Sequence, residues 1–148
     1  MRYRHPTIAT VALLALAAVL AAGCATVQPG ADPVLVNAER SLNVATLSLD
    51  GLFKTDYQYG ATVIDPLVPS WKAAVNALRV QAPPVLDAAN ASIKAYRALL
   101  ALRRADPTQV TQAQLNELAA DLGRKIVAAV QLGQTAAQVA ASWQGGGK

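Results

Sequence analysis

The chain has 148 residues, of which 53% are hydrophobic, and its 13 basic and 9 acidic side chains give a formal net charge of +4. This length is sufficient for one domain with a hydrophobic core. The basic residues are scattered, with adjacent pairs only at Arg103-Arg104 and Arg124-Lys125, which excludes the concentrated basic surface of a nucleic-acid-binding protein.

The first 23 residues are typical of a secretory signal peptide. Arg2 and Arg4 supply positive charge, and the run from Thr7 to Ala22 that follows contains no charged residue. This run is shorter than the roughly 20 residues that span a bilayer core as a helix, although an uncleaved helix extended to Val27 would just cross. The pattern therefore favours a cleaved export signal.

Cys24 is the last residue of the short sequence AAGC, which resembles the lipobox of bacterial lipoproteins. The resemblance covers residues 1–25 and has Ala21 where leucine is more usual. It implies cleavage after Gly23 and a diacylglyceryl group on Cys24, and the acyl chains that lipoproteins carry there would anchor the protein in a membrane. Because Ala25 rather than aspartate follows the cysteine, the resemblance also implies the outer membrane, facing the periplasm, in a Gram-negative cell. A buried thiol and an intermolecular disulfide are the alternatives for this cysteine.

Cleavage after residue 23 changes the composition of the chain. Without Arg2 and Arg4, 11 basic residues remain against 9 acidic ones, a net charge of about +2, and the one histidine, His5, is removed. A mature chain without histidine excludes Ser-His-Asp and Cys-His nucleophile systems and His/Cys zinc sites. We expect a lipidated tether over 24–32, a helical domain over 33–143 and a disordered tail over 144–148, with no metal or cofactor.

The first helix is predicted to begin after Asp32, which is a good N-cap, with Pro33 at the first helical position. Apolar or small residues recur at spacings of three and four and so share one face. They are Leu35, Ala38, Leu42, Ala45, Leu49 and Leu52. The helix should end near Lys54.

The connection over residues 55–70, TDYQYGATVIDPLVPS, is long for a loop in a helical bundle. It contains Gly60 and two prolines, but Tyr57 and Tyr59 are among several residues that make it too apolar for a flexible linker. Two interpretations remain: the segment lies across the bundle and covers core, or it is an aromatic recognition loop.

The second helix is predicted to start with Ser70 as N-cap and to run to Arg104. Its apolar stripe stays in phase across the tandem prolines Pro83-Pro84, and comprises Trp71, Val75, Leu78, Ala82, Leu86, Ala89, Ile93, Tyr96 and Leu100. Interior prolines remove hydrogen bonds and clash with the preceding turn. We therefore expect one kinked helix whose halves face the same core, the alternative being two helices with a turn at residues 81–83.

The third helix has two possible starts. Asp106-Pro107 repeats the arrangement of Asp32-Pro33, and Thr111 with Gln114 forms a possible capping box. The apolar stripe that follows is Leu115, Leu118, Leu122, Ile126, Ala129, Gly133, Ala136, Ala140 and Trp143. Because Gly133 falls on this stripe, it would permit close approach of a neighbouring helix.

Three long helices with apolar seams and two connections predict an all-α fold, an up-down-up antiparallel three-helix bundle with a kinked middle helix at Pro83-Pro84. Trp71 and Trp143 are candidate partner contacts, with core packing as the simpler interpretation. Glu117 and Asp121 share one helix face, but Arg124 and Lys125 follow them, so ion pairing explains them more simply than catalysis.

The leading hypothesis is a non-enzymatic, lipid-anchored cell-envelope protein that acts through contacts with an envelope protein or the envelope itself. Its membrane partner is engaged through the acylated Cys24. The alternative is a periplasmic small-molecule carrier with an apolar pocket between helices, lined by Tyr57, Tyr59 and Tyr96. An accessory or lysis-related factor that needs an inner-membrane partner is a third possibility.

Overall fold

Helix α2 runs from Pro33 to Thr55 in a computed structural model that describes residues 31–64 and 69–145. The Asp32 carboxylate accepts a hydrogen bond from the backbone N–H of Leu35 at 3.0 Å, and Pro33 lies in the first turn. This confirms the predicted cap and start. The buried face is Ala38, Leu42, Ala45, Leu49 and Leu52, so five of the six residues of the predicted stripe are buried.

The chain does not leave the helical path at Lys54. A π-helix, η2, follows directly over Asp56–Ile64, so the first half of the predicted connection is helical and continuous with α2. Ile64 is completely buried, which anchors the end of η2 in the core. Residues 65–68 lie outside the described residues, and residues 69–70, the end of the predicted connection, belong to the next helix.

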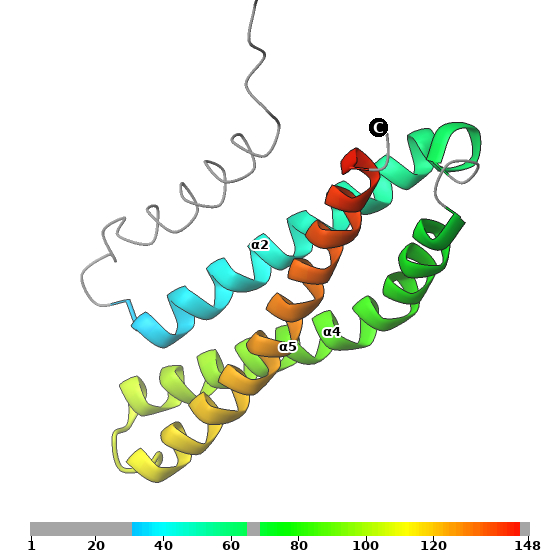
Figure 1. The fold of residues 1–148 in the computed structure, drawn as a ribbon. Coiled ribbons are helices and arrows are strands. Elements are labelled where there is room, and N and C mark those ends of the chain that lie inside the picture. Colours follow the sequence, from blue (N-terminus) through cyan, green and yellow to red (C-terminus); the bar gives the residue numbers. More distant parts are fainter. Residues whose placement is uncertain (1–30, 65–68, 146–148) are drawn as a thin grey trace, which may run out of the picture. The chain divides into compact units, whose positions relative to one another are not determined.

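Helix α4, Pro69–Ala105, is continuous across both prolines, so the alternative of two separate helices is wrong. Pro83 and Pro84 are exposed, which places the hydrogen bonds lost at these positions toward solvent. Ala82 and Ala89, on either side of them, are buried. Figure 1 shows α4 bending along its length, as expected for interior prolines in a helix whose core face continues.

The turn before the last helix uses Asp106 differently from Asp32. The Asp106 carboxylate accepts hydrogen bonds from the backbone N–H and the hydroxyl of Thr108, at 2.9 and 2.7 Å. These bonds to the side chain stabilise a turn over residues 106–108. Helix α5, Gln112–Gly145, begins five residues after Pro107. Its cap is the reciprocal pair Thr111 and Gln114, with N···O distances of 2.8 and 3.2 Å. The Asp106-Pro107 start is wrong, and the Thr111 capping box is confirmed.

The three helices form an up-down-up antiparallel bundle, and no strand occurs in the part of the chain that the structure describes (Figure 1). Helix α5 contacts both α2 and α4 far more extensively than these two contact each other. One buried cluster includes Ala38, Ile93, Leu122 and Ala129, and a second includes Leu52, Trp71, Val75 and Ala136. The predicted fold class is confirmed, with α5 extending two residues past residue 143.

Candidate functional site

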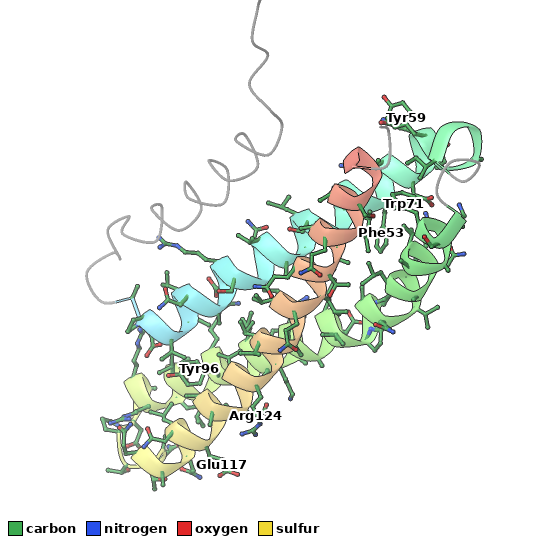
Figure 2. All side chains as sticks on the ribbon, in the orientation of Figure 1. Phe53, Tyr59, Trp71, Tyr96, Glu117 and Arg124 are labelled. Carbon is green, nitrogen blue, oxygen red and sulfur yellow. The ribbon has the colours of Figure 1, made fainter. Side chains whose placement is uncertain are left out.

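The structure separates the three tyrosines that were expected to share a pocket. Tyr57 and Tyr59 lie on η2 and are 90% and 51% exposed, whereas Tyr96 lies on α4 and is 4% exposed. Figure 2 shows Tyr59 and Tyr96 near opposite ends of the bundle. No pocket lined by all three is therefore formed, and Tyr57 and Tyr59 remain as the exposed aromatic pair. Cys24, the predicted lipidation site, lies outside the described residues.

Tyr96 links α4 to the point where the chain enters α2. Its hydroxyl donates to the Asp32 carboxylate at 3.5 Å, a long hydrogen bond. Burial of the phenol raises the pKa of Tyr96 above its ordinary value, and the negative charge and hydrogen bond of Asp32 raise it further. Both effects disfavour the phenolate, so the group is a structural contact.

The structure describes the side chain of Trp71 but not that of Trp143. The Trp71 side chain is 2% exposed, and its indole Nε1–H donates to the carbonyl oxygen of Val139 on α5 at 2.9 Å. This confirms that Trp71 is a core residue and excludes it as a surface contact of the folded bundle. The backbone of Trp143 belongs to α5, but its side chain lies outside the described part, so its role stays a prediction.

A buried carboxylate at the junction of α2 and η2 is the most unusual polar feature of the described chain. The Asp56 side chain is 2% exposed and lies 2.6 Å from Arg79 Nη2 and 3.2 Å from Lys72 Nζ, both on α4. The Arg79 guanidinium also lies over the Phe53 ring, 5.5 Å from its centroid. A buried carboxylate requires such partners, because an unpaired charge there is strongly disfavoured. We refer to Asp56, Lys72 and Arg79 as the junction cluster.

Gly60 completes the packing around the junction cluster. A Cβ on residue 60 would overlap the Oδ1 atom of Asp56, so any other residue here would displace the carboxylate from its present position. The cluster thus ties the segment that carries Tyr57 and Tyr59 to α4. Asp56 was not singled out in the sequence analysis; the signal was the spacing of Lys72 and Arg79, seven residues apart on one face of the next helix.

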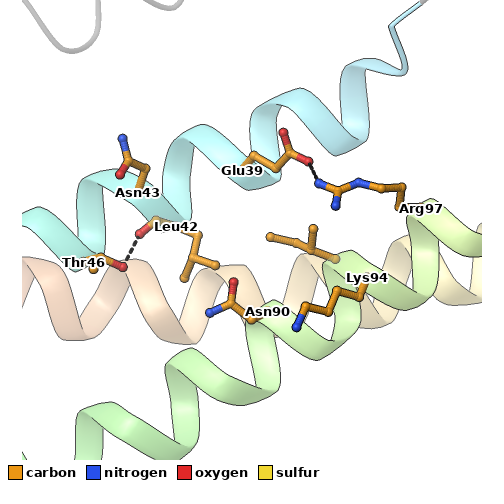
Figure 3. Close-up of a pocket in the computed structure, with 8 residues that line it drawn as sticks. Glu39, Leu42, Asn43, Thr46, Asn90, Lys94 and Arg97 are labelled. Atoms are coloured by element: carbon orange, nitrogen blue, oxygen red, sulfur yellow. Dashed lines mark hydrogen bonds and ion pairs between the residues drawn. The ribbon is translucent and has the colours of Figure 1, made fainter.

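A groove of about 290 Å³ lies between α2 and α4. Figure 3 shows the ion pair between Glu39 of α2 and Arg97 of α4 bridging the two helices, with Leu42 reaching from α2 into the space between them. The remaining lining side chains are Asn43, Thr46, Asn90, Ile93 and Lys94. Sequence reasoning missed this groove, because it depends on how far apart α2 and α4 are held.

The carboxylates Glu117 and Asp121 do not form an isolated pair. Asp121 lies 2.7 Å from Lys125 Nζ and 3.4 Å from Arg124 Nη2, and it accepts from the Ser92 hydroxyl at 2.9 Å. The hydrogen bond from Lys125, followed by that from Ser92, lowers the pKa of Asp121 below its ordinary value. The pair does line a second groove of about 400 Å³, with Leu99 and Leu118 among its other residues.

Residues 31–64 and 69–145 contain no group of three or more His, Cys, Asp or Glu side chains placed to hold a metal ion. None of the described helices combines the length and apolarity needed to cross a membrane. The chain as a whole matches no protein-family model, no curated protein and no solved structure.

Proposed function

We propose that this protein is a lipid-anchored cell-envelope protein that acts through contacts with a partner in the envelope rather than through catalysis. The observation that carries the proposal is the position of Cys24, directly after an uncharged run and the small residues AAG. Cleavage before Cys24 leaves an acylated first residue, a tether over 24–32 and the helical bundle. In a Gram-negative cell, the bundle would face the periplasm from the outer membrane.

The arrangement of the bundle supports contacts at the end opposite Asp32, where α2 begins. The tether enters at Asp32, at the start of α2, whereas Tyr57 and Tyr59 follow the other end of this helix of 23 residues. At 1.5 Å per residue, the two ends of α2 are about 34 Å apart. Tyrosine is favoured in protein interfaces, and the junction cluster holds this pair on an ordered segment.

The charged residues near the carboxylate candidates also favour binding over chemistry. Asp56 and Asp121 each contact two basic side chains, and Glu39 is paired with Arg97. Each of these carboxylates has a structural partner that accounts for it. Ion pairing, and not acid or base catalysis, is therefore the simpler explanation of their positions.

Alkyne-palmitate labelling tests the anchor directly. The full chain and its Cys24→Ala variant are expressed in a Gram-negative host, labelled, and separated into inner-membrane, outer-membrane and soluble fractions. We expect label that depends on Cys24 in the outer-membrane fraction. An unlabelled, soluble wild-type protein would overturn the anchor, and the thiol would then be a candidate for pairing between chains.

Site-specific photo-crosslinking tests the contact surface. A benzophenone amino acid is placed in intact cells at Tyr57, or at Leu102 of α4, which is 51% exposed. We expect a discrete adduct from position 57 that is absent from position 102. Equal adducts from both positions, or none from position 57, would contradict a specific contact at the tyrosine pair.

A further inference from the structure

An ion pair spans the groove between α2 and α4. Glu39 of α2 pairs with Arg97 of α4 across it. Helix α5 packs against both helices through the core, and α2 and α4 contact each other much less. The groove is therefore a gap between two helices that both pack against α5, with this exposed ion pair across it.

The base of the groove is apolar and its rim is polar. Leu42 and Ile93 are 6% and 5% exposed, and they line the groove from the two facing helices. Asn43, Thr46 and Asn90 contribute polar groups to the lining. A small apolar surface with a few convergent polar groups is the usual composition of a ligand site.

The side chains that line the groove carry a net positive charge. Lys94 and Arg97 supply two positive charges and Glu39 one negative charge, and that negative charge is already paired with Arg97. Among residues 31–64 and 69–145, no hydrogen bond or ion pair is formed by the Lys94 ammonium or by the side-chain amides of Asn43 and Asn90. Asn90 and Lys94 are four residues apart on one helix and are therefore neighbours on its surface. Together they offer N–H donors and a positive charge beside an apolar base.

We propose that this groove binds a small amphiphilic carboxylate. Its head group accepts hydrogen bonds from Lys94 and Asn90, and its short hydrocarbon body covers Leu42 and Ile93. A volume of about 290 Å³ lies at the lower end of the range for small-molecule sites, so the ligand has a body of a few carbons and not a long acyl chain. The site is separate from the tyrosine pair, and the proposal does not depend on the lipid anchor.

The test uses methyl NMR of the full chain in lipid nanodiscs, with isoleucine δ1 methyls labelled. Ile93 lies in the groove, whereas Ile64 and Ile126 lie in the core outside its lining and serve as internal references. The probes are butyrate, butylammonium, butanol and inorganic phosphate, each titrated at constant ionic strength. We expect butyrate to shift the Ile93 methyl in a saturable manner, and butylammonium and butanol to shift it much less.

Three variants test whether the positive charge of Lys94 is responsible for butyrate binding. Lys94→Gln removes the unpaired ammonium and should weaken butyrate binding about tenfold, the size of effect expected for one charge-assisted hydrogen bond. Lys94→Arg keeps the charge and should retain most of the affinity. The matched control is Lys54→Gln, at an exposed lysine on α2 that pairs with Asp50 outside the groove, and it should leave affinity unchanged. Circular dichroism confirms that each variant keeps its helix content.

Three other patterns of methyl shifts would overturn the proposal. Equal Ile93 shifts with butyrate and inorganic phosphate would show that only an adventitious ion binds. Equal shifts with butyrate, butanol and butylammonium would show apolar contact without recognition of the carboxylate. Shifts at Ile64 and Ile126 as large as those at Ile93, or no saturable shift, would show that the groove holds no such ligand. None of these results bears on Cys24 or on the crosslinking at Tyr57, so the two proposals fail separately.

Discussion

Gly133 of α5 lies against Ala45 of α2 so closely that a Cβ on residue 133 would approach the Cα of Ala45 to 2.8 Å and its Cβ to 3.1 Å. Real Cβ atoms do not approach a backbone atom this closely, so a side chain here would require α2 and α5 to move apart. The glycine on the apolar stripe of α5 therefore sets the distance between these two helices, as its position in the sequence predicted.

Gly133→Ala is expected to destabilise the bundle by about 1–3 kcal/mol, because overpacking outweighs the gain in helix propensity. Gly51→Ala and Gly123→Ala are matched controls, since both glycines are helical and a Cβ on either would meet nothing within 4 Å. These two changes should stabilise the protein by about 0.5–1 kcal/mol. Urea unfolding followed by circular dichroism measures all three, and a stabilising Gly133→Ala would refute the close contact.

Asp56→Asn should lower the free energy of unfolding by about 2 kcal/mol. The substitution keeps the shape but removes the negative charge that compensates Lys72 and Arg79. The loss is smaller than for a fully buried pair, because these two side chains remain 37% and 41% exposed and regain hydration. The control is Asp50→Asn, at a carboxylate that is 51% exposed, which should change stability by less than about 0.5 kcal/mol. Equal effects at the two positions would contradict the structural role of Asp56.

Gly60 and Asp56 should be energetically coupled. Gly60→Ala introduces a Cβ that overlaps the Asp56 carboxylate, and so should destabilise the wild-type protein. In an Asp56→Ala background the carboxylate is absent, and the same change should cost less. A double-mutant cycle by urea unfolding measures the coupling, for which about 1 kcal/mol or more is expected. Strict additivity would show that the glycine is required for another reason.

Asp121 gives a pH dependence with a definite sign. Its pKa is lowered in the folded protein, first by the hydrogen bond from Lys125 and then by that from Ser92. Its stabilising contribution is therefore fully present above the unfolded-state pKa of about 3.9 and is lost as the pH falls through the lower folded-state value. Asp121→Asn should thus be less stable than wild type at pH 7, and the difference should shrink below about pH 4. Urea midpoints measured from neutral to strongly acidic pH test this, and a constant difference would exclude the titration of Asp121 as its cause.

Two aspartate-proline pairs show which local features the sequence could predict. Asp32-Pro33 is followed directly by the apolar periodicity of α2, and the aspartate caps the helix as expected. Asp106-Pro107 is followed by Thr108, whose N–H and hydroxyl both bind the aspartate, so a turn forms instead. An aspartate carboxylate can accept backbone N–H groups either as a helix N-cap or within a turn. At Asp106 the buried position of Val110 favours the turn. That preference depends on tertiary packing and is not visible in the dipeptide.

The sequence did not predict the π-helix η2 or the groove between α2 and α4. The conformation of η2 places Asp56 against partners that lie 16 and 23 residues further along the chain, and no local propensity encodes such a contact. The groove likewise depends on the separation of α2 and α4. In contrast, the three helices and most of their buried faces follow from apolar spacing alone, because that pattern is repeated over many turns.

The central position of α5 has a consequence for how the protein is made. This helix follows α2 and α4 in the chain, and it supplies most of the surface against which they pack. A nascent chain that has emerged only as far as α4 has few contacts with which to hold its two helices together. The packing of α2 against α4 is therefore expected to become firm only once α5 has been added to the chain.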